Sequence, residues 1–526
     1  MISDLHALAV ATFAAVWLAG LLDLTRRADL SRGRRVGWAL AILLLPTIGA
    51  AAYLLTRPVP VDRLLVGAPA PGEGAAARGP RGPRVVKQVA SKASRGLFRS
   101  VEVVRPVSVA TTGPQLWCAS HFGALSDPIV LLHALERPPR FLAGDFMWRI
   151  PVLRGALDAV RAIPVRRSQD GGGASNRDMF AASVDALAEA DLVAVFPEGV
   201  ATEGAQVAPL RTGAARIALG AVDAGVSGVA IVPVGVHYQD RAALRRRVFV
   251  DVGEPLDLDA WLASRAGDRE PAVAEDRALV RALTDVLDHR LRGVAPQFAD
   301  LEQAHALHAA AEIALVGDPA APPSWGQRSE LAADLGRAPS EERAAIVARV
   351  AGYREALDAA GLSDAEVEGP PAVSGRRVMA RLLLGLLLLP FAFLGALVHA
   401  PLALLTAAVG RLRVAPPTLA TILPVVGLVG ALLTWGLFAW WLSAPDVFGP
   451  PADDGWVART VAMVQWWLVL PAWGWAAAVV GEGLASARHA LRTRRRLGRS
   501  ATAAVLPAMR EQRSEVVARV ERVASR

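Results

Sequence analysis

The chain has 526 residues, of which 53% are hydrophobic, and a formal net charge of +8 at pH 7. This length exceeds that of an ordinary domain with a single hydrophobic core, so two or three structural regions are expected. The chain has a single cysteine, Cys118, which excludes an intrachain disulfide and a cysteine-rich zinc site. Its positive charge comes almost entirely from arginine, which is compatible with binding to anionic lipid headgroups and equally with the basic segments that flank the spans of most membrane proteins.

The amino-terminal region, residues 1–57, is expected to be a membrane anchor. Residues 5–22 and 38–56 are apolar stretches long enough to cross a bilayer, and the basic loop 26–35 separates them. No charged region precedes the first stretch, so a cleaved signal peptide is not expected. The stretch 38–49, with Asp-Leu-Ser-Arg upstream, resembles the two-helix amino-terminal segment of bacterial cardiolipin synthases. That resemblance implies an anchor and carries no catalytic residue.

Residues 58–100 are expected to form a basic linker rich in Gly and Pro, because Gly, Pro, Ala and Arg dominate residues 66–84. After it, short apolar or β-branched runs alternate with longer amphipathic patterns, which indicates an α/β layered domain over residues 101–300. The runs that predict strands are 101–104, 116–119, 192–196 and 229–234, and residues 176–190 predict a helix.

Residues 257–368 are rich in alanine and helical by pattern, with Pro296 and the Pro319–Pro323 cluster as punctuation. We expect these helices to pack against the α/β domain. The part from 301 to 375 is assigned as a helical extension.

The region 376–482 is expected to be a second membrane domain, with apolar blocks at 378–410, 417–443 and 459–481. Arginines flank both ends of the first block and Pro390 and Pro401 lie inside it, which favours a bent re-entrant pair over one straight span.

The loop 444–458 contains acidic residues without a basic one, and tryptophans crowd its borders, so it is expected to be external. The basic tail, residues 483–526, is then expected to be cytoplasmic.

Four short motifs follow one another between Leu116 and Gly235. They are Ser120-His121 with Asp127-Pro128, Ile163-Pro164-Val165-Arg166-Arg167, Phe196-Pro197-Glu198-Gly199, and Ile231-Val232-Pro233-Val234-Gly235. This ordered set resembles the glycerolipid acyltransferase family. Five residues separate His121 from Asp127, and this spacing is similar to that of the branch containing the fungal glycerol-3-phosphate and dihydroxyacetone-phosphate acyltransferases.

Further stretches resemble the same branch, and the resemblance covers roughly residues 100 to 410. In the segment 209–220, Arg211 stands where the branch has a lysine; His237-Tyr238, the arginines 245–247 and the segment 252–255 also match. The chain departs from the pattern at Ser120, which replaces the usual asparagine, and at residues 200–203.

Transfer of an acyl group from a thioester to an alcohol needs a base and a group that orients it, and His121 and Asp127 can fill these two roles. Six positions apart on a regular helix, the two side chains would be about 240° out of phase. His121 is therefore expected in a loop and Asp127 at the start of a helix, where Pro128 is favoured as the first residue.

Two other interpretations of this motif stay open. Asp127 can be the N-cap of a helix over residues 128–136, with His121 an ordinary loop histidine. A catalytic metal could use His121, Asp127 and His133, but His133 sits in an apolar helical pattern, so no metal is expected.

The second and third motifs are expected to bind substrate. Arg167 is the best phosphate ligand because a guanidinium matches phosphate oxygens bidentately, and Arg166 is the close alternative. Phe196-Pro197-Glu198-Gly199 follows a strand at the edge where open α/β sheets bind ligands, so Glu198 can hold the arginine or a glycerol hydroxyl. Arg211 either adds positive charge for phosphate or donor, or is a solvated surface residue. The fourth motif is expected to line an acyl-chain channel.

The resemblance implies a membrane-bound O-acyltransferase that uses an acyl thioester, from coenzyme A or acyl carrier protein, and needs no cofactor. The implied acceptor is glycerol 3-phosphate, dihydroxyacetone phosphate or lysophosphatidic acid, with membrane lipids as partners and no nucleic acid. A non-catalytic lipid-binding or scaffold protein with the same fold is the rival. We expect a multi-pass protein of the cell membrane with a cytoplasmic catalytic domain. The basic loop 26–35 conflicts with this if both amino-terminal segments span.

Overall fold

The computed structural model describes residues 81–525 except 107, 167–175, 266–273, 316–322, 369–374, 446, 448–449, 451–454 and 498–499. Before residue 81 it describes residues 17, 21, 24–25, 32–44, 53 and 62–64. The chain divides into two compact units. The smaller contains residues 1–58, 370–412 and 425–505, and the larger contains residues 59–369, 413–424 and 506–526.

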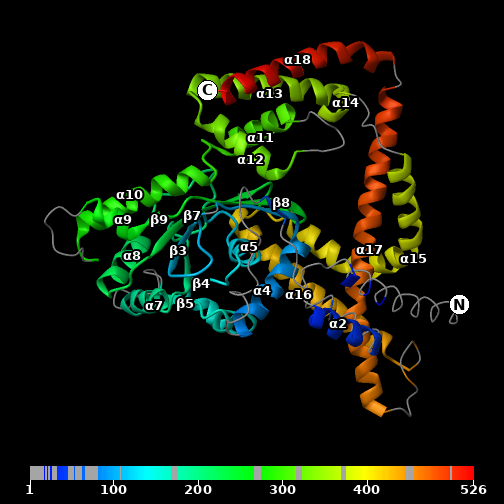
Figure 1. Ribbon diagram of the computed structural model, residues 1–526. Helices are drawn as coiled ribbons and strands as arrows, with labels where there is room; N and C mark the ends of the chain where they lie inside the picture. Colours follow the sequence, from blue (N-terminus) through cyan, green and yellow to red (C-terminus); the bar gives the residue numbers. More distant parts are fainter. Residues whose placement is uncertain are drawn as a thin grey trace. The chain divides into compact units, whose positions relative to one another are not determined.

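One mixed sheet forms the centre of the larger unit (Figure 1). Within the described residues its strands run in the order β1-β2-β8-β7-β3-β6-β4-β5, and β9 pairs with the start of β7. Their bounds are β1 Asp62–Leu64, β2 Phe98–Val104, β3 Gln115–Ala119, β4 Arg140–Gly144, β5 Ile163–Val165, β6 Leu192–Val195, β7 Ala230–Tyr238, β8 Arg246–Val252 and β9 Leu256–Asp257. Strands β7, β3, β6, β4 and β5 are mutually parallel, so their carboxyl ends lie along one edge.

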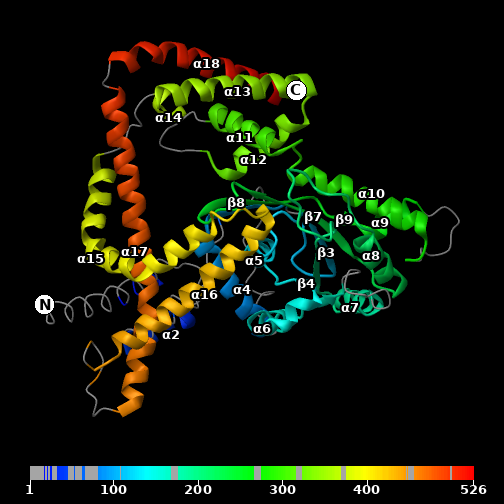
Figure 2. The ribbon, with the colours of Figure 1, turned by 180° about the vertical axis from the view of Figure 1, so that it is seen from behind.

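Helices cover both faces of this sheet, as Figures 1 and 2 show. Since side chains alternate along a strand, Trp117 and Ala119 of β3 face one core while Leu116 and Cys118 face the other. The first core is closed by α4 (Arg81–Leu97) and α5 (Ser126–Ala134), and the second by α7 (Asn176–Ala188), α8 (Gly213–Asp223), α9 (Leu258–Ala263) and α10 (Arg277–Val294).

This architecture confirms the predicted layered α/β domain, including the strands expected near 101, 116, 192 and 229 and the helix expected at 176–190. One boundary was wrong. The expected linker, 58–100, contains all of α4, whose Ala90 and Leu97 are buried in the first core. Its abundant Gly, Pro and Arg concealed a helix that packs with the domain.

The helical extension consists of α11 (Leu301–Leu315), α12 (Trp325–Arg337), α13 (Ser340–Ala360) and α14 (Asp364–Glu368). The buried residue Glu102 of β2 joins this extension to the sheet. The Glu102 carboxylate accepts hydrogen bonds from the backbone N–H groups of Trp325 (3.0 Å) and Gly326 (2.7 Å), which start α12. A carboxylate at a helix amino terminus satisfies otherwise unpaired amides, so this contact joins the extension to the sheet as expected.

Most of the carboxy-terminal helix α18 (Ser500–Ala524), from residue 506 on, belongs to the same unit, so part of the expected tail 483–526 is helical and packed. Arg513 is buried; its Nε donates to Asp364 (3.0 Å) and its Nη2 donates to the carbonyl of Ile313 (2.8 Å). The basic composition that suggested a tail therefore includes structural arginines that bind α18 to the extension.

The smaller unit contains α2 (Arg32–Leu44), α15 (Gly375–Val409), most of α16 (Pro416–Leu442) and α17 (Gly455–Leu497). Among the described residues of the chain, three helical stretches, 388–409, 418–442 and 455–485, are long and apolar enough to cross a membrane. The expected re-entrant pair at 378–410 is instead one helix with Pro390 and Pro401 inside it, and α15 changes direction along its length in Figures 1 and 2. Prolines bend a helix without ending it where packing supports the bend.

Little of the amino-terminal apolar pair lies within the described residues. Those that do contribute to one buried cluster in the smaller unit, because Trp17 donates to the Ile42 carbonyl (3.0 Å) and Ile42, Tyr53 and Val469 are fully buried together. The described residues of this region therefore pack with Val469 of α17.

The first turns of α16 fold with the larger unit. Proline has no N–H, so Pro424 cannot donate to the carbonyl of Ala420 four residues earlier. That carbonyl instead accepts a hydrogen bond from the hydroxyl of Ser126 at the start of α5 (3.1 Å). The proline thus leaves free the acceptor that joins the first turns of α16 to the start of α5.

Candidate functional site

The carboxyl edge of the parallel strands gathers the motif residues. His121 follows β3, the segment Phe196–Gly199 follows β6, Arg166 follows β5, and Tyr238 ends β7. Ligands of open α/β sheets bind at this edge. The fold therefore brings the first and third motifs onto neighbouring strands, β3 and β6.

His121 and Asp127 form a hydrogen-bonded pair. His121 lies in the loop after β3, and Asp127 lies in the first turn of α5, with 2.8 Å between Nδ1 and a carboxylate oxygen, Oδ2. The same oxygen accepts from the backbone N–H of Gly123 (2.9 Å), and the other oxygen, Oδ1, accepts from the hydroxyl of Tyr238 (2.7 Å). The carboxylate is thus fully buried and engaged on both oxygens.

This geometry decides against the N-cap interpretation of Asp127. Helix α5 begins at Ser126, the residue in the N-cap position is Leu125, and no side chain caps the helix. The helix also differs from the expected 128–136, and Pro128 is its third residue rather than its first. The Asp127 carboxylate turns back toward the loop, where it binds His121 and Gly123 instead of the helix amides.

The imidazole of His121 is held from several sides. Its ring stacks on Phe196 at 4.2 Å between centroids, its backbone N–H donates to Glu198 (2.7 Å), and its carbonyl accepts from the N–H of Thr202 (2.8 Å). The side chain remains 18% exposed. Since Asp127 engages Nδ1, the other ring nitrogen, Nε2, is the atom left for a substrate.

Glu198 connects two loops. One of its carboxylate oxygens accepts from the His121 amide and the other from the amide of Ala208 (2.9 Å), and only 2% of the residue is exposed. Burial raises the pKa of Glu198, while the two amide donors act in the opposite direction. The structure thus gives Glu198 a role that the sequence did not predict, which is to hold the backbone of His121.

Arg211 lies over Gly199. A side-chain carbon placed on Gly199 would come within 2.7 Å of the Arg211 Nε. Gly199 also has a φ of +74°, so both the available space and the backbone conformation require glycine at this position. The Arg211 amide also donates to the carbonyl of Pro197 (2.8 Å). An exposed guanidinium therefore stands directly beside the third motif.

The second motif is only partly described. Arg166 is exposed, and its Nε lies 4.0 Å from a carboxylate oxygen of Asp145, which follows β4. Arg166 follows β5, and strand β4 lies between β5 and β6, the strand that precedes the third motif. Arg167 lies outside the described residues. Its phosphate-binding role stays a prediction.

The fourth motif is the core of strand β7. Ile231, Val232 and Val234 are fully buried and divide between the two cores, so they are not the wall of an open channel. Ser120, which departs from the family pattern, is also buried, and its hydroxyl accepts from the amide of Val236 (3.0 Å). The serine is thus a structural link between β3 and β7.

Other candidate residues are structural. Cys118 is buried in β3, and burial raises its pKa to about 12. His133 is buried in α5, and burial lowers the pKa of His237 to about 4. Among the described residues, no group of three or more His, Cys, Asp or Glu side chains is arranged to hold a metal.

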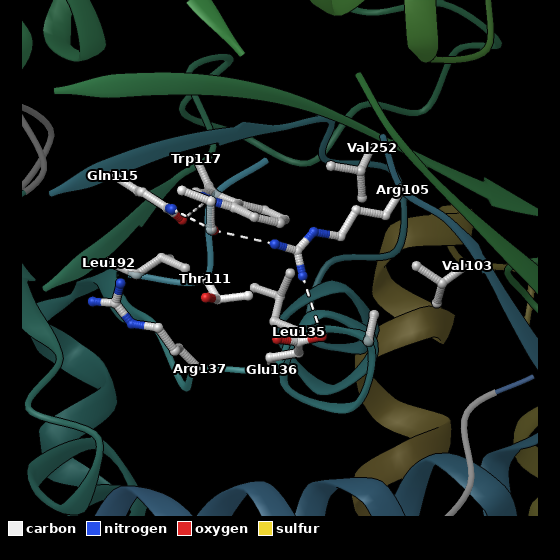
Figure 3. A pocket seen from close by; sticks show the side chains of 12 residues that line it. Val103, Arg105, Thr111, Gln115, Trp117, Leu135, Glu136, Arg137, Leu192 and Val252 are labelled. Atoms are coloured by element: carbon white, nitrogen blue, oxygen red, sulfur yellow. Dashed lines mark hydrogen bonds and ion pairs between the residues drawn. The ribbon is translucent and has the colours of Figure 1, made fainter. Parts of the chain in front are cut away.

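A small cavity of about 20 Å³ lies at the opposite edge of the sheet, near the first residues of β3 and β6 (Figure 3). Arg105 and Glu136 form an ion pair in its wall (3.3 Å), and Trp117 donates to Gln115 (2.9 Å). A space of this size holds about one water molecule, so it is not a substrate site.

Parts of the chain are similar to known proteins. The acyltransferase family model matches residues 100–237, and the phospholipase D-nuclease N-terminal model matches residues 15–58. Glycerol-3-phosphate O-acyltransferase 2 of Saccharomyces cerevisiae is 38% identical over 85 residues, which are 16% of this chain and 11% of the yeast protein. Glycerol-3-phosphate O-acyltransferase 1 of the same yeast is 30% identical over 117 residues, 22% of this chain and 15% of the yeast protein.

The matched stretches thus cover a small part of these relatives' own length. Among solved structures, the 1-acyl-sn-glycerophosphate (LPA) acyltransferase of Thermotoga maritima aligns with a TM-score of 0.30 at 16% identity, over 40% of this chain and 80% of that one. The chain carries an acyltransferase domain at residues 100–237, behind an amino-terminal segment of the phospholipase D-nuclease type.

Proposed function

We propose that the protein is a membrane-bound glycerolipid O-acyltransferase. It transfers a fatty acyl group from a thioester of coenzyme A or acyl carrier protein to a hydroxyl of glycerol 3-phosphate, dihydroxyacetone phosphate or lysophosphatidic acid. The observation that carries the proposal is the His121–Asp127 pair, with Nε2 of the imidazole left for substrate at the carboxyl edge of the sheet. The yeast relatives, which bear the name glycerol-3-phosphate O-acyltransferase, support glycerol 3-phosphate as one candidate among these acceptors.

In the proposed reaction, Nε2 of His121 takes the proton of the acceptor hydroxyl as its oxygen attacks the thioester carbonyl. The resulting tetrahedral intermediate collapses, the carbon–sulfur bond breaks, and the thiolate takes the proton from the imidazolium. Asp127 fixes the tautomer of His121 and stabilises the imidazolium that forms between these steps.

The test is an assay of the purified full-length protein in detergent with a labelled acyl thioester and each acceptor in turn. Formation of a labelled ester with one acceptor supports the proposal and identifies that acceptor. If no acceptor is labelled while the protein still binds lipid, the non-catalytic lipid-binding or scaffold function would replace it.

Two arginines are proposed to bind the acceptor's phosphate, namely Arg167 of the second motif and Arg211 beside Gly199. We expect Arg167→Ala and Arg211→Ala each to raise KM for the phosphorylated acceptor by about 10-fold or more, because a charge-assisted hydrogen bond contributes roughly 1.5–3 kcal/mol. KM for the acyl donor is expected to change much less. Steady-state kinetics with each substrate varied in turn measures both values.

Arg154→Ala is the matched control, since Arg154 is an exposed arginine of α6 (Pro151–Ala159) whose closest ion-pair partner is Asp158, at 3.8 Å. An equal rise in both KM values would remove the tested arginine from the phosphate site and make Arg166 the next candidate.

We further propose that the protein spans the cell membrane with the acyltransferase domain in the cytoplasm, where acyl thioesters are made. The acidic loop containing Asp453 is then external, and Arg495 is cytoplasmic. In a Cys118→Ser background, Asp453→Cys is expected to react with a membrane-impermeant thiol reagent on intact cells, and Arg495→Cys to react only after lysis. The reverse labelling pattern would place the domain outside and separate it from its donor.

A further inference from the structure

The hydroxyl of Tyr238 lies 2.7 Å from the Asp127 Oδ1, the oxygen that does not bind His121. We propose that Tyr238 is a positioning residue, which holds the Asp127 carboxylate in the orientation that aligns His121 for proton transfer. The proposal rests on the acyl-transfer function proposed above. Tyr238 lies one residue beyond the matched acyltransferase segment, and 111 positions from Asp127 in the chain.

The tyrosine ring is held in place by contacts that do not involve Asp127. Tyr238 is the last residue of β7, paired with Val248 of β8, and its ring packs against Phe98 at 6.0 Å between centroids. Strand pairing and ring packing remove rotational freedom from the side chain, so its hydroxyl is presented to Asp127 at little further entropic cost.

Gly123 makes room for this contact. A side-chain carbon on Gly123 would lie 2.4 Å from the Tyr238 hydroxyl oxygen, a distance that no non-bonded pair of such atoms tolerates. The loop between His121 and Asp127 therefore needs a glycine at this position so that the Tyr238 hydroxyl can reach the Asp127 carboxylate. The amide of the same glycine donates to the other Asp127 oxygen (2.9 Å).

The hydroxyl acts as a donor and not as a base. Burial, with the Asp127 charge beside it, raises the pKa of Tyr238 well above its ordinary value, so the phenol stays protonated throughout the working range. A neutral O–H donating to a carboxylate in a buried site is a charge-assisted hydrogen bond. Because the hydroxyl is directed at Asp127, its loss changes the alignment of the pair rather than a contact with substrate.

The first test is Tyr238→Phe in the full-length enzyme, which removes the hydroxyl alone. We expect kcat to fall about 10-fold or more, the effect of losing one charge-assisted hydrogen bond at the reacting pair, while both KM values stay within about two-fold. The matched control is Tyr353→Phe, which removes an equivalent 2.8 Å bond from a tyrosine hydroxyl to Asp364 in the extension. The control is expected to keep the wild-type kcat.

Two results would overturn the proposal. One is a Tyr238→Phe enzyme with kcat within two-fold of wild type. The other is a loss of activity in both tyrosine variants in proportion to their loss of thermal stability, since that pattern reports folding only.

A second measurement needs no turnover and separates this inference from the proposed function. The chain has three tyrosines, so labelling with 3-fluorotyrosine gives three ¹⁹F resonances that single Tyr→Phe variants assign. Asp127→Asn is expected to move the Tyr238 resonance and leave that of Tyr353 in place. An unmoved Tyr238 resonance would refute the contact even in an active enzyme. Absence of acyl transfer in the wild type, with the Tyr238 resonance moved, would count against the proposed function alone.

Discussion

Replacing His121 with alanine is expected to abolish acyl transfer while the protein stays folded. The imidazole supplies the only proposed base, and removal of a general base costs about 10²–10⁴-fold in rate. Its ring is 18% exposed and stacks on one side against Phe196, so its loss leaves the buried cores unchanged. Turnover of the purified variant, measured with its circular dichroism and thermal midpoint, checks both parts of the expectation.

His289→Ala provides the matched control, because His289 is an exposed histidine of α10, a helix that packs on the sheet. It is expected to keep wild-type turnover. A folded His121→Ala enzyme that also kept wild-type turnover would show that another group removes the proton.

Asp127→Asn is expected to be at least as damaging, although the side chain keeps its size. Asp127 accepts from Nδ1 of His121, the amide of Gly123 and the hydroxyl of Tyr238. An asparagine offers one accepting oxygen and one NH₂ group, so at least one of these donors would face another donor. The His121 tautomer is then no longer fixed, and by analogy with catalytic triads the loss in kcat is on the order of 10⁴-fold.

A stability measurement separates this catalytic role from a structural one. Asp364→Asn is the control, since Asp364 is also bonded by a tyrosine and by Arg513, far along the chain from the site residues. Both variants are expected to lower the thermal midpoint, but only Asp127→Asn should lower specific activity. Lower stability of Asp127→Asn at full specific activity would assign the carboxylate to folding.

The sequence was informative where function depends on local spacing. The five residues between His121 and Asp127 rule out a shared helix, and this placed one residue in a loop and the other at a helix start, as the structure confirms. The third motif was placed correctly after a buried strand because the run 192–196 is apolar. Its exposed neighbour Arg211 was named from the segment 209–220, but its position over Gly199 was not predicted.

Contacts between distant positions could not be predicted in this way. Tyr238 reaches Asp127 only because β7 and β3 are adjacent in the sheet, and no period or spacing in one sequence encodes strand order. Of the two amide contacts of Glu198, one is to Ala208, ten residues downstream, and the other is to His121, 77 residues upstream. Composition also misled, since the Gly, Pro and Arg of residues 66–84 suggested a linker over 58–100, whereas α4 packs into the larger unit.

The division of the larger unit into three stretches of chain determines the order in which it can form during synthesis. Residues up to 369 leave the ribosome first, the long apolar helices follow, and α18 comes last. At about 5–20 residues per second, this interval lasts on the order of ten seconds. Throughout it, Asp364 and the Ile313 carbonyl lack Arg513, and the apolar surface that receives Met509, Val516 and Val520 stays uncovered. The nascent domain must therefore stay folded without α18 while the apolar helices are synthesised. In a fragment that ends at residue 369, the same apolar surface would stay exposed to solvent, and we expect such a fragment to aggregate.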